Sequence, residues 1–150
     1  MKMKILKILF FACLIVPVMT QAQRFDRDEI ESLRVAIFTK QMELTPAESK
    51  VFWPIYNKFR EAMNKQHRSR RERMSHLRKD MATLSEAEVK TLVEAEVTFY
   101  EKEATLTRKY NEEFKKILPI KKVARLYIAE EAFKRELIDR LRESRHRNRN

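Results

Sequence analysis

Apolar side chains recur every three or four residues along most of the chain, which is the spacing of amphipathic α-helices. The pattern divides into four stretches, which we expect to be helices over about 26–42, 46–81, 85–118 and from 120 onward. The second stretch has one apolar, aromatic face, which consists of Val51, Phe52, Ile55, Tyr56 and Phe59. The chain is therefore predicted to be all-α.

The same spacing assigns an inner face to the third stretch. We expect this face to consist of Val89, Val93, Tyr100, Thr107, Tyr110, Phe114 and Ile117, flanked by Leu92, Phe99 and Leu106. In the second stretch the apolar spacing lapses between Met63 and Met74. This part of the helix is predicted to be thinly packed or to face a partner.

Two capping boxes mark helix starts. Thr45 and Glu48 flank Pro46, which suits a first helical position because its missing N–H would have no partner there. Ser85 and Glu88 repeat the capping pattern at the start of the third stretch. Because the connection before Ser85 is short, the long second and third helices are predicted to form an antiparallel hairpin.

Prolines are expected to bend one helix and end another. Pro54 lies inside the second predicted helix, where it removes one backbone hydrogen bond and should bend the axis. Such a bend would let Trp53 and Tyr56 lean toward the first helix. Pro119 is expected to end the third helix.

The sequence suggests an internal repeat. Leu44-Thr45-Pro46 and Leu118-Pro119-Ile120 lie 74 residues apart. A Lys-Val step and an aromatic and aliphatic stripe follow each of them.

Composition narrows the fold class further. The 150 residues include no glycine, and 37% of them are charged. Hairpin turns of β-sheets and phosphate-binding loops depend on glycine, so β-rich and nucleotide-binding folds are disfavoured. We predict one all-α domain over 23–143, followed by a disordered basic tail over 144–150.

Residues 1–22 have the composition of a secretory signal peptide. Three lysines precede an apolar run over 8–19, and Ala22 supplies a small residue for cleavage. The run is shorter than the roughly 20 residues that span a bilayer. We therefore predict export to the periplasm with cleavage after Ala22. Retention of the segment as an anchor and lipidation at Cys13 are the alternatives left open.

Cleavage would change the charge and the chemistry of the chain. It removes three lysines, so the net charge falls from +11 to +8, and it removes the only cysteine. The mature chain then has no disulfide and no thiol nucleophile. A basic exported protein meets acidic proteins, anionic lipid or lipopolysaccharide, so we do not expect a nucleic-acid partner.

Candidate catalytic groups are sparse. His67 and His76 lie nine residues apart, so on one helix they point to opposite sides and cannot share a metal. Paired glutamates two residues apart also diverge around a helix. We predict that the protein is not an enzyme and has no metal or cofactor; a zinc site at a dimer seam is the alternative left open.

Two arginine-rich segments are candidate partner-binding surfaces. They consist of Arg68, Arg70, Arg71 and Arg73 in the second predicted helix and of Arg140, Arg142 and Arg145 near the C-terminus. The first segment has two interpretations: it docks acidic partners or an anionic membrane, or it pairs internally with Glu94 and Glu96 across the hairpin. The second segment has no acidic run opposite it and is predicted to be free.

The starts of the second and fourth helices carry motifs of a known family. They consist of Leu44, Thr45, Pro46, Glu48, Phe52, Trp53, Pro54 and Tyr56, then of Leu118, Pro119, Lys121, Lys122 and Val123, and of Phe133 with the four residues after it. Over about 25–142 the chain resembles the Spy/CpxP-like envelope proteins, and most of all the small secreted proteins labelled sensors of ECF-type sigma factors. It departs from the Leu-Thr-x-x-Gln pattern, since Glu48 replaces the glutamine and the second site has no threonine.

The resemblance implies a bent four-helix hairpin, often a cradle-shaped homodimer, that binds unfolded proteins without ATP or reports stress to a signalling protein of the envelope or inner membrane. We therefore expect a non-enzymatic periplasmic stress sensor or accessory protein of an ECF-type sigma factor pathway, with chaperone-like binding. The alternative is a basic peripheral envelope protein that binds anionic lipid or lipopolysaccharide. Such a protein would be sensitive to salt and indifferent to unfolded chains.

Overall fold

The computed structural model describes residues 27–147, and these residues contain four helices and no strand. The helices are α1 (Arg27–Met42), α2 (Pro46–Asp80), α3 (Glu86–Ile117) and α4 (Ile120–Arg147). All-α structure in four helices is therefore confirmed for this part of the chain. The predicted signal peptide lies outside the described residues.

Both predicted capping boxes are present. The Thr45 hydroxyl accepts a hydrogen bond from the Glu48 N–H at 3.2 Å, and the Thr45 N–H donates to the Glu48 carboxylate at 2.8 Å. Ser85 and Glu88 make the same pair of bonds at 3.4 and 2.8 Å. These bonds satisfy backbone groups that the first turn of a helix leaves unpaired, which fixes where α2 and α3 begin.

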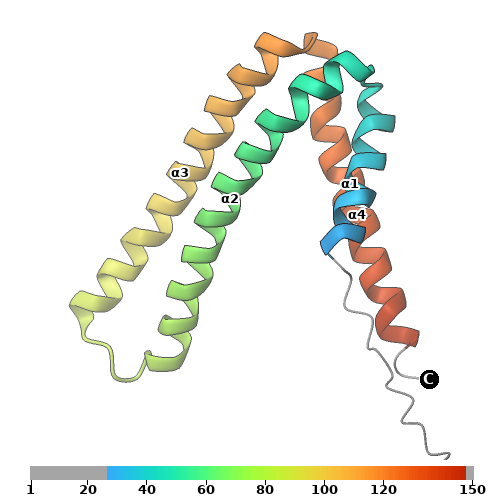
Figure 1. Cartoon of the computed structure of the whole chain (residues 1–150). Helices are drawn as coiled ribbons and strands as arrows, with labels where there is room; N and C mark the ends of the chain where they lie inside the picture. Colours follow the sequence, from blue (N-terminus) through green and yellow to red (C-terminus); the bar gives the residue numbers. More distant parts are fainter. Residues whose placement is uncertain (1–26, 148–150) are drawn as a thin grey trace, which may run out of the picture.

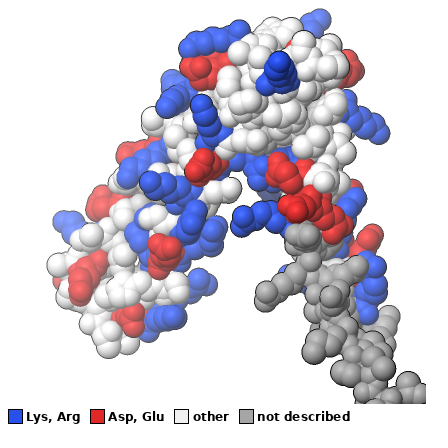
Figure 2. Space-filling view, viewed as in Figure 1, with Lys and Arg blue, Asp and Glu red and all other residues white. Residues whose placement is uncertain are grey.

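The helices form two arms that meet at one end (Figure 1). The long arm is the antiparallel pair α2 and α3, and the short arm is the pair α1 and α4. We call the end where the arms join the apex. The space-filling view shows a hollow between the arms (Figure 2), which we call the inter-arm cleft. The two longest helices are therefore neighbours along their length, and the chain reverses direction between them at the far end of the long arm.

The main hydrophobic core lies at the apex, where all four helices contribute side chains. Its buried residues are Phe38, Met42, Leu44, Phe52, Tyr56, Phe114, Leu118, Val123, Leu126, Ala129 and Phe133. The Phe38 ring of α1 lies 4.9 Å from the Tyr56 ring and 5.9 Å from the Trp53 ring of α2. Such aromatic pairs each contribute about 0.5–1.5 kcal/mol beyond the burial of their area.

Helix α2 continues through Pro54. The predicted contact of Trp53 and Tyr56 with the first helix is confirmed by their distances to Phe38. The core therefore joins α1 to the first turns of α2 through aromatic rings.

The prediction for the inner face of α3 is wrong at three positions. Val93 and Tyr100 are each 56% exposed, and Thr107 is also exposed, whereas Phe99 is only 3% exposed. Two apolar rows run side by side along α3, and the row that contains Phe99 packs against α2. The row of Val93 and Tyr100 is left without cover in the described part of the chain.

The predicted start of a disordered tail at Ser144 is also wrong. Helix α4 extends to Arg147, so residues 144–147 are helical. Basic residues suit the last turn of a helix because they interact favourably with its carbonyl end. Across residues 27–147, no helix has the length and hydropathy needed to cross a bilayer.

Candidate binding cleft

The inter-arm cleft combines charged and apolar side chains. Figure 2 shows Lys and Arg side chains along the inner edge of the long arm, opposite acidic side chains of the short arm. Cavities open on this side of the molecule and are lined from α1, α2, α3 and α4. The cleft is therefore the candidate functional site.

Most of the residues on which the predicted resemblance rests lie at the apex, where the arms join. Leu44, Phe52, Tyr56 and Leu118 are buried in the core, and Trp53 packs against it. Thr45 and Glu48 form the cap of α2, and Pro46 begins that helix. The motif residues thus build the junction above the cleft.

A partly buried polar network lies at the upper end of the cleft. The Tyr56 hydroxyl donates to the Glu130 carboxylate of α4 at 2.6 Å and accepts from the Arg34 guanidinium of α1 at 3.2 Å. Burial, together with the Glu130 charge, raises the pKa of Tyr56 far above its usual value. The Arg34 guanidinium also lies over the Phe133 ring at 4.2 Å. This network joins α1, α2 and α4 at one point.

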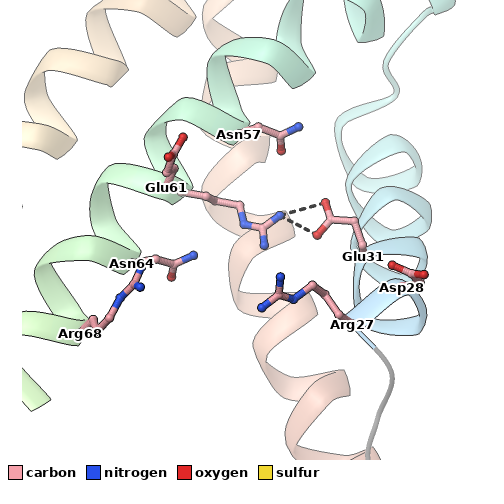
Figure 3. A pocket seen from close by; sticks show the side chains of 8 residues that line it. Arg27, Asp28, Glu31, Asn57, Glu61, Asn64 and Arg68 are labelled. Atoms are coloured by element: carbon pink, nitrogen blue, oxygen red, sulfur yellow. Dashed lines mark hydrogen bonds and ion pairs between the residues drawn. The ribbon is translucent and has the colours of Figure 1, made fainter.

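A polar cavity of about 510 Å³ lies between α1 and α2. Its lining includes Arg27 and Glu31 from α1, and Asn57, Arg60, Asn64 and Arg68 from α2. Arg60 donates to both oxygens of Glu31, at 2.7 and 2.9 Å, and so bridges the two arms (Figure 3).

Of these residues, only Arg68 was singled out from the sequence. Asn57, Asn64 and Arg68 share one row of α2, because residues seven and four apart lie one above the other on a helix. This polar row was the feature of the sequence that could have indicated the cavity. No feature of the sequence indicated the lining residues on α1, because tertiary packing determines how α1 approaches α2.

An apolar groove lies farther along the long arm. It is lined by Met74, Leu77, Leu92, Val93, Val97 and Tyr100, with Glu96 at its edge. Thr107, one heptad beyond Tyr100, lines a cavity with Arg34 and Tyr127 of the short arm. Residues at heptad spacing keep one orientation in a helix pair, so the exposed row of α3 faces the cleft.

The first predicted arginine segment is partly internal. Arg70 donates to Glu96 of α3 at 2.5–3.0 Å, as the internal interpretation predicted, and its guanidinium lies over the Phe99 ring at 5.0 Å. This hydrogen bond and the Arg70 charge lower the pKa of Glu96. Arg73 donates to Ser69 at 2.7 Å. Among residues 27–147, Arg68 and Arg71 have no ion-pair partner.

The prediction that the C-terminal arginines lack acidic neighbours is wrong for two of them. Arg140 pairs with Glu136 at 2.8 Å and approaches Glu29 of α1 to 3.6 Å. Arg142 approaches Asp139 to 3.5 Å. The sequence missed these pairs because one partner comes from α1 and the others from the preceding turn of α4. Arg145 has no ion-pair partner in the described part of the chain.

The two histidines of α2 each lie beside a carboxylate. His67 Nε2 lies 3.0 Å from Glu103, and its ring is edge-on to Phe99. His76 Nδ1 lies 2.7 Å from Asp80. Over residues 27–147, no three His, Cys, Asp or Glu side chains are grouped so that they could hold a metal ion.

Comparison of the chain with family models, with curated proteins and with solved structures gives no match.

Proposed function

We propose that this chain is a non-enzymatic stress sensor or accessory protein of the periplasm, linked to an ECF-type sigma factor pathway and able to hold unfolded segments in its cleft. The proposal includes export through the N-terminal segment and the bent hairpin fold of Spy/CpxP-like proteins. It rests on the motif residues at the apex and, above all, on the apolar row of α3 that faces the cleft.

The apolar row is the observation that carries the binding proposal. Val93, Val97 and Tyr100 are 53–56% exposed, and they border a groove whose other wall is Met74 and Leu77 of α2. Exposed apolar groups that are contiguous and rimmed by polar residues are typical of interaction sites. Methionine adapts to partners of different shape because its side chain is unbranched and flexible. The groove therefore suits apolar side chains of varied sequence.

The sensor part of the proposal follows from the same surface. An exported protein cannot touch a cytoplasmic sigma factor, so a membrane protein has to relay its state. Competition between unfolded segments and that membrane partner for the cleft would convert envelope stress into a signal.

Suppression of aggregation tests the binding proposal. A chemically denatured, aggregation-prone test protein is diluted into buffer with the purified chain at sub-stoichiometric to equimolar ratios, and light scattering is followed. We expect suppression by the unaltered protein and weaker suppression by the double variant Val93→Ser, Val97→Ser. The matched control is Val51→Ser, Ile128→Ser, because those residues are 46% and 55% exposed but do not line the groove.

Equal suppression by both double variants would remove the groove from the proposal. No suppression at any ratio would leave a dedicated sensor or the lipid-binding alternative. Vesicles with anionic lipid separate these two, because only a lipid binder associates with them in a manner that salt weakens.

A further inference from the structure

The pair formed by Arg60 and Glu31 shows that the face of α2 toward the short arm accepts a carboxylate. Arg60 holds both oxygens of Glu31, and the two side chains remain 25% and 39% exposed. Both bonds come from one nitrogen of the guanidinium, Nη1, and a hydrogen bond between a guanidinium and a carboxylate is stronger than one between neutral groups. Because both groups remain in contact with water, the pair can exchange with a competing carboxylate.

Two more guanidinium groups lie in the same cavity without a carboxylate of their own. Figure 3 shows Arg27 directed from α1 into the space between α1 and α2, and Arg68 lying along α2 below the Asn64 amide; both line the cavity. Within residues 27–147, neither arginine has an ion-pair partner. The cavity thus has one guanidinium that is occupied by Glu31 and two that are not.

The dimensions of the cavity fit a short peptide. Its volume is about 510 Å³, which accommodates several side chains. Arg60 and Arg68 are eight residues apart, or about 12 Å along the helix axis. Two carboxylates four residues apart in an extended peptide are separated by about 13 Å and lie on one side of it.

We infer that this cavity docks an acidic segment of a partner polypeptide, with one carboxylate on Arg60 and another on Arg68 and Arg27. Glu31 is then an internal competitor, which occupies Arg60 when no partner is bound. The cavity lies apart from the apolar groove, so the inference does not depend on binding of unfolded chains. Three carboxylates in the lining, Asp28, Glu31 and Glu61, balance the three arginines. Displacement of Glu31 frees Arg60 for one of the two carboxylates of the partner.

A labelled peptide tests the site directly. The probe has two glutamates separated by three Gly or Ser residues and no apolar side chain, and a peptide with glutamines in their place is the control. Fluorescence anisotropy measures its binding to the purified chain at low ionic strength. We expect Arg27→Gln, Arg68→Gln to weaken binding about fivefold or more, and Glu31→Gln to strengthen it about two- to fivefold.

The matched control for the competitor is Glu61→Gln. It changes the net charge by the same amount and lines the same cavity, but Glu61 has no ion-pair partner among the described residues. We expect a smaller gain in affinity from Glu61→Gln than from Glu31→Gln. Equal gains would overturn the role of Glu31 as a competitor, because they would report net charge alone.

Equal binding of the glutamate and glutamine peptides, or no loss of binding in the double arginine variant, would overturn the docking site. Circular dichroism and thermal unfolding of each variant show whether a loss of binding reflects a loss of fold. Since the probe carries no apolar side chain, its failure to bind leaves the aggregation result unaffected. Failure of aggregation suppression likewise leaves the peptide result unaffected.

Discussion

The Tyr56 hydroxyl donates to the Glu130 carboxylate at 2.6 Å. The two residues occupy the same position in α2 and α4: they lie 74 residues apart, as do the first residues of the two helices, Pro46 and Ile120. Glu48 and Lys122, which are also 74 residues apart, pair in the same way. Contacts between equivalent positions are typical of a twofold axis. The internal repeat suggested by the sequence thus coincides with a pseudo-twofold arrangement of α2 and α4 at the apex.

Tyr56→Phe should destabilise the fold by about 1.5–3 kcal/mol. The ring and its packing are kept, but the Glu130 carboxylate loses its donor and Arg34 loses its acceptor. Urea unfolding followed by circular dichroism measures the change. Tyr127→Phe is the matched control, because its hydroxyl donates to Asn111 at an exposed site, and it should cost about 0.5 kcal/mol or less. Equal costs would mean that the Tyr56 network does not stabilise the apex.

Phe52→Ala should cost about 3–5 kcal/mol, because the ring is fully buried among Phe38, Tyr56 and Phe114 and its removal leaves a cavity. Val51→Ala, at the neighbouring and 46% exposed position, should change stability by about 0.5 kcal/mol or less. Denaturant unfolding distinguishes the two. A small cost at Phe52 would show that the apex core tolerates a cavity and does not hold the arms together.

Stability should fall in acid partly through Glu96. Arg70 lowers the pKa of Glu96 from its ordinary 4.5 in the folded chain, so the folded state binds a proton less readily than the unfolded state. The resulting stabilisation is present above the unfolded value and is lost as the pH falls through the lowered folded value. The thermal midpoint should therefore fall between about pH 6 and about pH 3, and it should fall less in Glu96→Gln.

Glu94→Gln is the control for this acid dependence. It removes one carboxylate from the same turn of α3, and Glu94 has no ion-pair partner in the described part of the chain. This variant should keep the acid dependence of the unaltered protein. If Glu96→Gln kept it as well, the pair of Arg70 and Glu96 would not contribute to it.

Glu43→Gly should stabilise the protein by about 0.5–1 kcal/mol. Glu43 has a φ of 52°, which places a residue with a Cβ in the left-handed region at a cost of about 1–2 kcal/mol. Glycine removes this cost but adds about 0.5–1 kcal/mol of backbone entropy to the unfolded chain. The backbone carbonyl of residue 43, which accepts a hydrogen bond from Lys122 at 2.7 Å, is kept in this variant. Thermal unfolding measures the gain, and a loss of stability would show that the exposed pair of Glu43 and Arg125 outweighs the strain.

Local features of the fold could be predicted from the sequence. The capping boxes at Thr45 and Ser85 depend on residues three apart, and both are present. The pair of Arg70 and Glu96 could also be predicted, because a hairpin with a short turn fixes which residues lie opposite each other. The left-handed backbone at Glu43 gave no signal, because the sequence marks such sites by glycine and has none.

Features that depend on the distance between helices could not be predicted. Helix α3 carries two neighbouring apolar rows, and spacing alone does not decide whether Phe99 or Tyr100 packs against α2. The approach of Glu31 to Arg60, and of Glu29 to Arg140, depends on how α1 lies against the other helices. Apart from Arg68, the polar half of the candidate site was therefore missed, although its row on α2 was present in the sequence.

The arms join at the apex, so α2 acts as a lever. Its 35 residues extend about 52 Å, and a rotation of about 5° at the apex displaces the far end by about 4.5 Å. A small change in the packing around Phe38 and Tyr56 would therefore displace the hairpin turn near Met81 much farther than the apex itself. The length of the long arm sets this ratio between the angle at one end and the displacement at the other.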